Sequence, residues 1–157
     1  MLLERDGVNP NKPGSDGRTP LWCATWNGHA GVVKMLLERE GAALDQLDND
    51  GRTPRWGATW SGHEGVVKML LERGEANPDR PDNDGRTPLW CASWKGHEGV
   101  AQVLLERDEV NLNKRDNYGR TPLCYAALHG HTAVVKLLLA HDVVNPSKPH
   151  TLGRTPL

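Results

Sequence analysis

Histidine and cysteine are the first side chains of this sequence to examine for a metal site or a nucleophile, because the carboxylates are scattered with no constellation. Four histidines recur at intervals of 34 residues, at His29, His63, His97 and His131. If the units stack as helices do, neighbouring histidines lie about 10 Å apart, whereas zinc ligands lie about 2 Å from the ion. A shared metal ion is therefore excluded, and a role in capping a turn is favoured. We expect no metal and no cofactor.

The three cysteines, Cys23, Cys91 and Cys124, offer no catalytic group either. Cys23 and Cys91 lie two units apart, roughly 20 Å at the spacing of stacked helices, and a disulfide needs Cα atoms within about 7 Å. We therefore expect free thiols, which suit a reducing, cytoplasmic compartment. Cys23 is near His29 in sequence, but no residue around it would activate a thiolate. Because the common nucleotide-binding and hydrolase motifs are also missing, the sequence predicts that the chain is not an enzyme.

Tryptophan gives the strongest pattern, because all six tryptophans occupy two positions of one repeated unit. They form three pairs, Trp22/Trp26, Trp56/Trp60 and Trp90/Trp94, at intervals of 34 residues. Residues four apart project from the same side of a helix. The six rings are thus predicted to form an aromatic stripe along the molecule. Tryptophan is frequent at interface hot spots, so this stripe is a candidate binding surface.

Each unit predicts a turn, a short helix, a second turn, a longer helix and a loop. In unit 51–84, Thr53 followed by Pro54 is typical of a helix N-cap and first helical residue. Gly62 fits the left-handed position that ends this helix. A second, amphipathic helix is expected over 64–73. A fixed period of this length indicates stacked units that form a solenoid.

The order of these landmarks resembles the ankyrin repeat. Thr-Pro-Leu-x-x-Ala, then Gly-His, then Val-Val-Lys-x-Leu-Leu-Glu recur along the chain with few departures. The resemblance implies an all-α solenoid of stacked helix-turn-helix units with short β-turn fingers. It divides the chain into a single array of full repeats 17–50, 51–84, 85–118 and 119–152, flanked by partial repeats 1–16 and 153–157. We expect the array to be part of a longer one.

The resemblance also implies a function, the binding of a protein partner on a concave face. In ankyrin repeats the outer position of each tryptophan pair lines the concave groove, whereas the inner position is structural. The candidate anchors are therefore Trp26, Trp60 and Trp94. Units that combine Asn-Asp-Gly-Arg-Thr-Pro-Leu-Trp with Gly-His-Glu-Gly-Val-Val look like the ankyrin arrays of fungal NOD-like receptors. This likeness implies the recognition region of a larger receptor.

Two sets of polar residues beside the anchors complete the candidate partner-binding site. The residue after each outer tryptophan differs between repeats. A surface that distinguishes partners would show such variation, and so would neutral substitution at an exposed site. Arginines recur in the turns and either meet an acidic partner or pair with the neighbouring aspartates. These candidates are Asn27, Ser61, Lys95, Arg18, Arg52 and Arg86.

Composition narrows the partner class. Lysine and arginine total 19 against 20 aspartate and glutamate residues, a net charge of −1, which argues against nucleic-acid binding. No apolar stretch is long enough to cross a membrane. The alternative function is a structural segment that stacks weakly end to end, because both terminal repeats would expose apolar surface. Arg55 replaces a leucine of the other repeats and is expected to snorkel or to weaken packing.

Overall fold

The computed structural model describes residues 9–74 and 77–141. Within these residues the chain forms eight α-helices in four pairs and no strand, which confirms the all-α repeat fold. The first helices of the pairs are α1 (Pro20–Trp26), α3 (Pro54–Trp60), α5 (Pro88–Lys95) and α7 (Pro122–Leu128). The second helices are α2 (Ala30–Leu37), α4 (Glu64–Glu72), α6 (Glu98–Leu105) and α8 (Thr132–Leu139).

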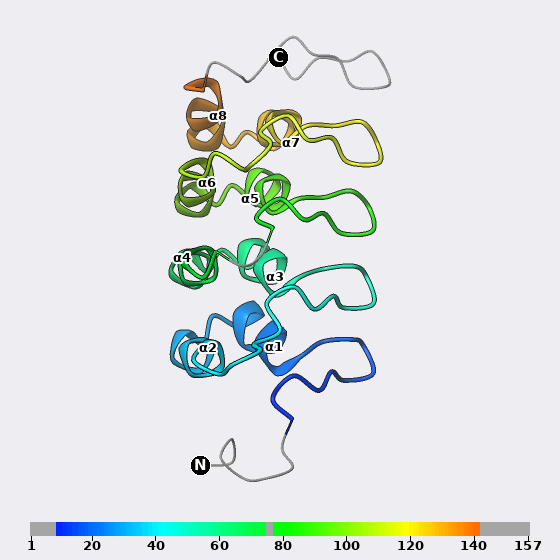
Figure 1. Ribbon diagram of the computed structural model, residues 1–157. Coiled ribbons are helices and arrows are strands. Elements are labelled where there is room, and N and C mark those ends of the chain that lie inside the picture. The colour runs from blue at the N-terminus through cyan, green and yellow to red at the C-terminus, as the bar shows by residue number, and fades with distance from the viewer. Residues whose placement is uncertain (1–8, 75–76, 142–157) are drawn as a thin grey trace.

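The helix pairs stack into two layers (Figure 1). One layer holds α1, α3, α5 and α7, and the other holds α2, α4, α6 and α8, with each helix against the next of its own layer and against its partner in the pair. The turns that precede the first helices project away from both layers as fingers. We define the fingers as residues 14–18, 48–52, 82–86 and 116–120. This arrangement leaves the first helices and the fingers on one common face of the solenoid.

The start and end of each first helix follow the local sequence. Thr53 caps α3, since its hydroxyl accepts a hydrogen bond from the amide of Trp56 at 3.1 Å, and Pro54 is the first helical residue. The same threonine cap begins α1, α5 and α7. Gly62 follows α3 with a φ of +79°, where a side chain would be strained. The predicted cap and the predicted left-handed glycine are both confirmed.

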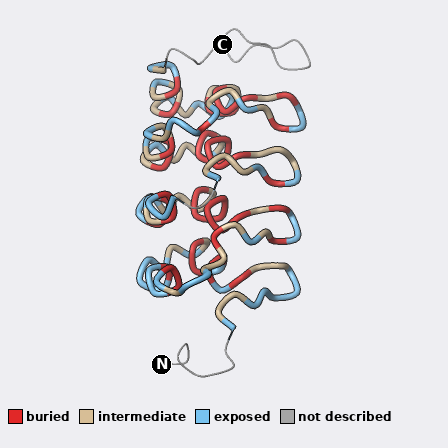
Figure 2. Tube along the Cα trace, in the orientation of Figure 1, coloured by how far each residue is buried: buried red, intermediate tan, exposed pale blue. Residues whose placement is uncertain are grey.

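The hydrophobic core lies between the two layers and between successive repeats. Val67 and Leu70 of α4 and Leu89 of α5 are at most 1% exposed, and Figure 2 shows buried residues along the first helices and the inner sides of the second helices. Each repeat therefore buries its apolar surface against the next, as a solenoid requires.

Of the two expectations for Arg55, the structure contradicts the first, that the side chain snorkels. The side chain does not reach solvent but is 3% exposed, and its Nη2 donates to the main-chain oxygen of Leu70 at 3.2 Å. Burial lowers the pKa of the guanidinium, while the nearby Asp45 raises it. Arg55 thus satisfies a carbonyl in the last turn of α4, a group that has no partner within its own helix.

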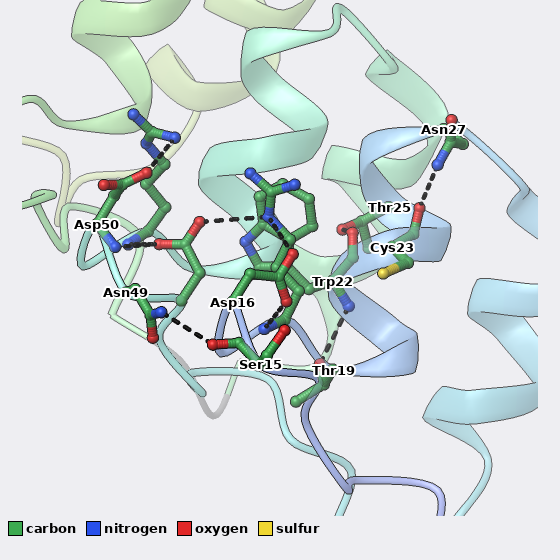
Figure 3. Close-up of polar contacts among 12 residues, drawn as sticks. Ser15, Asp16, Thr19, Trp22, Cys23, Thr25, Asn27, Asn49 and Asp50 are labelled. Atoms are coloured by element: carbon green, nitrogen blue, oxygen red, sulfur yellow. Dashed lines mark hydrogen bonds and ion pairs between the residues drawn. The ribbon is translucent and has the colours of Figure 1, made fainter.

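Hydrogen bonds between neighbouring fingers keep the repeats in register. The amide of Asn49 donates to the main-chain oxygen of Asp16 at 3.0 Å, and its side-chain amide donates to that of Ser15 at 3.1 Å (Figure 3). Equivalent bonds link Asn83 and Asn117 to the fingers before them. The carboxylate of a buried aspartate at the finger base, such as Asp48, accepts from two amides of its own turn.

The histidines of the Gly-His turns also join neighbouring repeats, which differs from the turn-capping role expected. None of His63, His97 and His131 caps its own helix with its side chain. Instead, Nε2 of His63 lies 3.1 Å from the main-chain oxygen of Trp26, at the end of the first helix of the preceding repeat. Each histidine therefore satisfies a helix C-terminus one repeat away.

Some predicted repeat boundaries lie outside the described residues. The first part of partial repeat 1–16, the end of repeat 119–152 and the whole of partial repeat 153–157 are in this group. The division of the chain at these places stays a prediction.

Candidate functional site

The inner tryptophans form the buried base of the face shared by first helices and fingers. Trp22, Trp56 and Trp90 are 2%, 2% and 1% exposed. The indole Nε1 of Trp90 donates to the Asp116 carboxylate of the next finger at 3.2 Å. Burial of such large rings makes the inner position part of the core of the array.

The outer tryptophans, Trp26, Trp60 and Trp94, are half-buried on the same face. Trp26 stacks on Trp22 with ring centroids 5.2 Å apart, and Trp60 stacks on Trp56 at 5.1 Å. The rings of Trp60 and Trp94 meet at 6.1 Å across the boundary between repeats. The structure thus brings Trp60 and Trp94 into contact, whereas the ring of Trp26 stacks on Trp22 of its own repeat. We call Trp26, Trp60 and Trp94 the outer row.

The finger arginines lie beside the inner tryptophans and are held by neighbouring acids. Arg52 pairs with Asp50 at 2.8 Å, and its guanidinium carbon lies 4.8 Å from the ring centroid of Trp56. Arg86 pairs with Asp84 at 2.7 Å and lies 5.0 Å from the ring of Trp90. A guanidinium over an indole gains cation–π attraction. Most of the binding capacity of these two arginines is therefore used within their own repeat.

Arg18 makes the same two kinds of contact and also approaches a carboxylate of the next finger. Its guanidinium carbon lies 4.0 Å from the Trp22 ring, and its Nε lies 3.5 Å from the Asp16 carboxylate and 3.7 Å from that of Asp48 in the next finger. Its charge is therefore balanced by two carboxylates. Arg18 has a side-chain exposure of 34%, against 24% for Arg52 and 21% for Arg86, so it is the most accessible of the three to a partner.

The three variable residues beside the outer row differ in how far they are already engaged. Asn27 donates its side-chain amide to the main-chain oxygen of Cys23 at 2.8 Å, which closes the end of α1 (Figure 3). Lys95 holds its Nζ 4.3 Å from the ring centroid of Trp60 in the preceding repeat. Ser61 is half-buried between them. The three equivalent positions of successive repeats therefore hold an amide, a hydroxyl and an ammonium group, each engaged to a different degree.

Tyr125 is a member of this aromatic face that the sequence pattern did not reveal. It lies one residue after Cys124, which occupies the inner tryptophan position of the fourth repeat. Its ring stacks on Trp94 with centroids 5.1 Å apart, and its hydroxyl donates to Asp116 at 3.0 Å. Burial raises the pKa of the Tyr125 hydroxyl, and the hydrogen bond to Asp116 raises it further. The only signal in the sequence was an aromatic residue displaced by one position.

The metal-ligating and nucleophilic side chains of the described residues are dispersed along the array. Residues 9–74 and 77–141 include no group of three or more His, Cys, Asp or Glu residues that could hold a metal ion. Cys23, Cys91 and Cys124 are free. Burial raises the pKa of the Cys91 thiol well above its ordinary value, which disfavours the nucleophilic thiolate. What this face does provide is apolar rings and cations for contact with a partner.

Comparison with known families agrees with the repeat geometry. The family model described as ankyrin repeats (3 copies) matches residues 1–82 and 40–116, and the one described as ankyrin repeats (many copies) matches residues 104–148. A search of curated proteins found no match. In the part of the chain that the structure describes, no helix is both long and apolar enough to span a membrane. Since the family matches extend over most of the sequence, the chain belongs to the ankyrin repeat family.

Proposed function

We propose that the array binds a protein partner on its concave face, with the outer row as its apolar anchors. Ankyrin repeats generally mediate protein–protein interaction and are typically non-enzymatic. The observation that carries the proposal is the half-burial of Trp26, Trp60 and Trp94 on one face. Each ring packs against neighbouring rings and is only half-buried. A rigid aromatic side chain loses little conformational entropy on binding.

Two sets of residues around the outer row would make the polar contacts that select the partner. Asn27, Ser61 and Lys95 follow the anchors and differ in size and charge. The finger arginines Arg18, Arg52 and Arg86 extend the proposed binding surface from the outer row toward the fingers. Because the arginines are paired within their own repeats, we expect them to contribute orientation more than affinity.

We further propose that the array is the recognition region of a larger cytoplasmic receptor. Support comes from the likeness of its repeat units to the ankyrin arrays of fungal NOD-like receptors and from three free thiols, which suit a reducing compartment. In this proposal the partner is a protein, and neither nucleic acid nor a membrane is bound.

The test is capture of a partner by the immobilised array and by two triple variants. The first replaces Trp26, Trp60 and Trp94 with alanine. The matched control replaces three exposed lysines of the second helices with alanine: Lys34, Lys68 and Lys136. We expect a specific partner to be retained by the wild type and the control and lost by the tryptophan variant. Equal retention by the tryptophan variant, with its helix content intact, would refute the concave-face proposal.

A second candidate function is weak self-association through the ends of the stack. Val32 and Met35 of α2 are 47% and 37% exposed, and Leu139 of α8 is 42% exposed. Residues equivalent to Val32 and Met35 are covered by the preceding repeat in α4, where Val66 is 3% exposed and Met69 half-buried. The residue equivalent to Leu139 in α4, Leu71, is 6% exposed because the next repeat covers it. Analytical ultracentrifugation distinguishes the two functions, because end-to-end stacking requires a mass that rises with concentration.

A further inference from the structure

The ring face that each outer tryptophan turns toward the following repeat is covered at two of the three described junctions. Trp60 has the Nζ of Lys95 4.3 Å from its centroid, and Trp94 has the ring of His129 stacked at 5.4 Å with an interplanar angle of 17°. Lys95 and His129 occupy the same position of their repeats, directly after the outer position. At these junctions the chain itself provides a nitrogen-bearing side chain for the indole face.

The junction between the first and second repeats lacks this cover. The equivalent position holds Ser61, whose side chain is too short to reach over the Trp26 ring. The position four residues earlier is Gly57, where the third and fourth repeats have Cys91 and Tyr125. A Cβ atom added at Gly57 would lie 3.5 Å from the Trp26 ring and 3.8 Å from the Trp22 ring, so Gly57 lies beside the stacked pair and provides no side chain to cover Trp26. Within the described residues, no ring or cation of the second repeat lies over Trp26.

Within residues 9–74 and 77–141, Arg18 is the cation that lies near Trp26, and it belongs to the opposite, finger side. Its guanidinium carbon lies 6.0 Å from the Trp26 centroid, at the outer limit of a cation–π contact, but 4.0 Å from that of Trp22. Its two carboxylate contacts, with Asp16 and Asp48, hold it there. The side of Trp26 that faces the second repeat therefore keeps the indole surface that Lys95 covers on Trp60.

We propose that Trp26, together with Ser61 and Gly57, is a recognition site for a lysine or arginine side chain of the protein partner. The partner's cation takes the position over Trp26 that Lys95 takes over Trp60. Indole is the strongest cation–π acceptor among the side chains, and the contact strengthens as the cation loses water. This inference rests on the proposed function of the concave face. It adds that the junction between the first and second repeats selects a cationic side chain of the partner.

The test is a titration of the folded chain with acetyl-Gly-Lys-Gly-amide, followed through the six indole N–H resonances. Single Trp→Phe variants assign these resonances. The matched control peptide has norleucine in place of lysine, which keeps the alkyl chain and removes the charge. We expect the lysine peptide to shift the Trp26 resonance. We also expect it to bind about fivefold more tightly than the norleucine peptide, which corresponds to ~1 kcal/mol of binding free energy. Equal affinities, or an unmoved Trp26 resonance, would overturn the proposal.

Two reciprocal variants test the role of the covering position. Ser61→Lys provides an internal cation for Trp26 and should abolish the shift, whereas Lys95→Ser should uncover Trp60 and add a shift of its resonance. If Ser61→Lys binds the peptide as the wild type does, or Lys95→Ser gains no response at Trp60, the proposal is wrong. If these tests fail while the triple tryptophan variant still loses a captured partner, only the proposed cation site is refuted. Loss of both results would refute the concave-face function as well.

Discussion

Nε2 of His97 lies 3.1 Å from the main-chain oxygen of Trp60, the last residue of α3 in the preceding repeat. Because a carbonyl oxygen only accepts hydrogen bonds, Nε2 must be the protonated ring nitrogen. His63 and His131 make the same contact with Trp26 and Trp94, at 3.1 and 2.7 Å. The backbone of every outer-row residue is therefore tied to the next repeat, which fixes the spacing of the candidate anchors.

Replacement of His97 by alanine should weaken the array by about 1–3 kcal/mol, because the half-buried carbonyl of Trp60 loses its partner across the repeat boundary. His29 is the matched control, since it is exposed and has no such contact in the described part of the chain. Its alanine variant should change stability by less than about 0.5 kcal/mol, as for a surface site. Urea unfolding of the two variants measures the difference. Equal losses would mean that the inter-repeat bond contributes nothing to stability.

The two tryptophans of the second repeat should differ in what they stabilise. Trp56→Ala removes a ring that is 2% exposed and should cost about 3–5 kcal/mol. The sequence pattern alone predicts a cost below about 1 kcal/mol for Trp60→Ala. Half-burial and the stacking of Trp60 on Trp56 raise this expectation to about 1–2 kcal/mol. Partner affinity should fall by about 2 kcal/mol or more for Trp60→Ala.

Unfolding titrations and a binding measurement on the same two variants separate these effects. Circular dichroism should show unchanged helix content for Trp60→Ala. If Trp60→Ala destabilises the array as much as Trp56→Ala does, the outer row is structural and the binding proposal loses its main support.

Arg55→Leu should raise the stability of the array by about 1 kcal/mol. The substitution removes a buried guanidinium, whose desolvation is costly, and restores the leucine found in the other repeats. It also removes the hydrogen bond to the main-chain oxygen of Leu70, which offsets part of the gain. Thermal unfolding measures the net effect. A lower melting temperature would show that capping of α4 outweighs the desolvation of the arginine.

Asp79 should make the stability of the array depend on pH. Burial raises the pKa of its carboxyl to about 6, against the opposing effects of the Asn111 amide and Lys114. Its folded-state pKa exceeds its unfolded value of 3.8, so the folded form holds the proton more tightly. The contribution of Asp79 to stability is complete below pH of about 4 and is lost as the pH rises through about 6.

Asp79→Asn should remove this loss, because an amide still accepts a hydrogen bond and has no charge to desolvate. Asparagine stands at the equivalent positions 11 and 113, and Oδ1 of Asn11 accepts from the amide of Ala43 at 3.2 Å. We expect the variant to exceed the wild type in melting temperature at pH 7.5 by more than at pH 4. A difference independent of pH would contradict the raised pKa.

Hydrogen exchange should be slowest in the two central repeats. Repeat stability is close to a sum of each unit and its contacts with neighbours, and the exposed side chains of α2 and α8 mark surfaces with fewer contacts. The amides of α3 to α6 are therefore expected to be protected longest. Uniform protection from α1 to α8 would show that the array unfolds as one unit, without fraying from its ends.

The sequence by itself determined the repeat, its helices and the inner and outer tryptophan positions. Thr53, Pro54 and Gly62 act within one turn of the chain, through a cap, a preset φ and a tolerated left-handed conformation. Such local preferences do not depend on the rest of the fold. The period of 34 residues then required identical units to stack, which defined one continuous face.

Only the tertiary structure decided how neighbouring repeats share that face. Lys95 covers Trp60, and His97 bonds its carbonyl, through contacts between residues 35 and 37 positions apart. Arg55 is buried because the end of α4 offers it an acceptor, and Tyr125 fills the space beside Trp94 although it lies one residue out of register. These contacts depend on the offset and rotation between stacked units. A repeated sequence pattern contains no local signal for either quantity, because they are set by how side chains pack across the boundary.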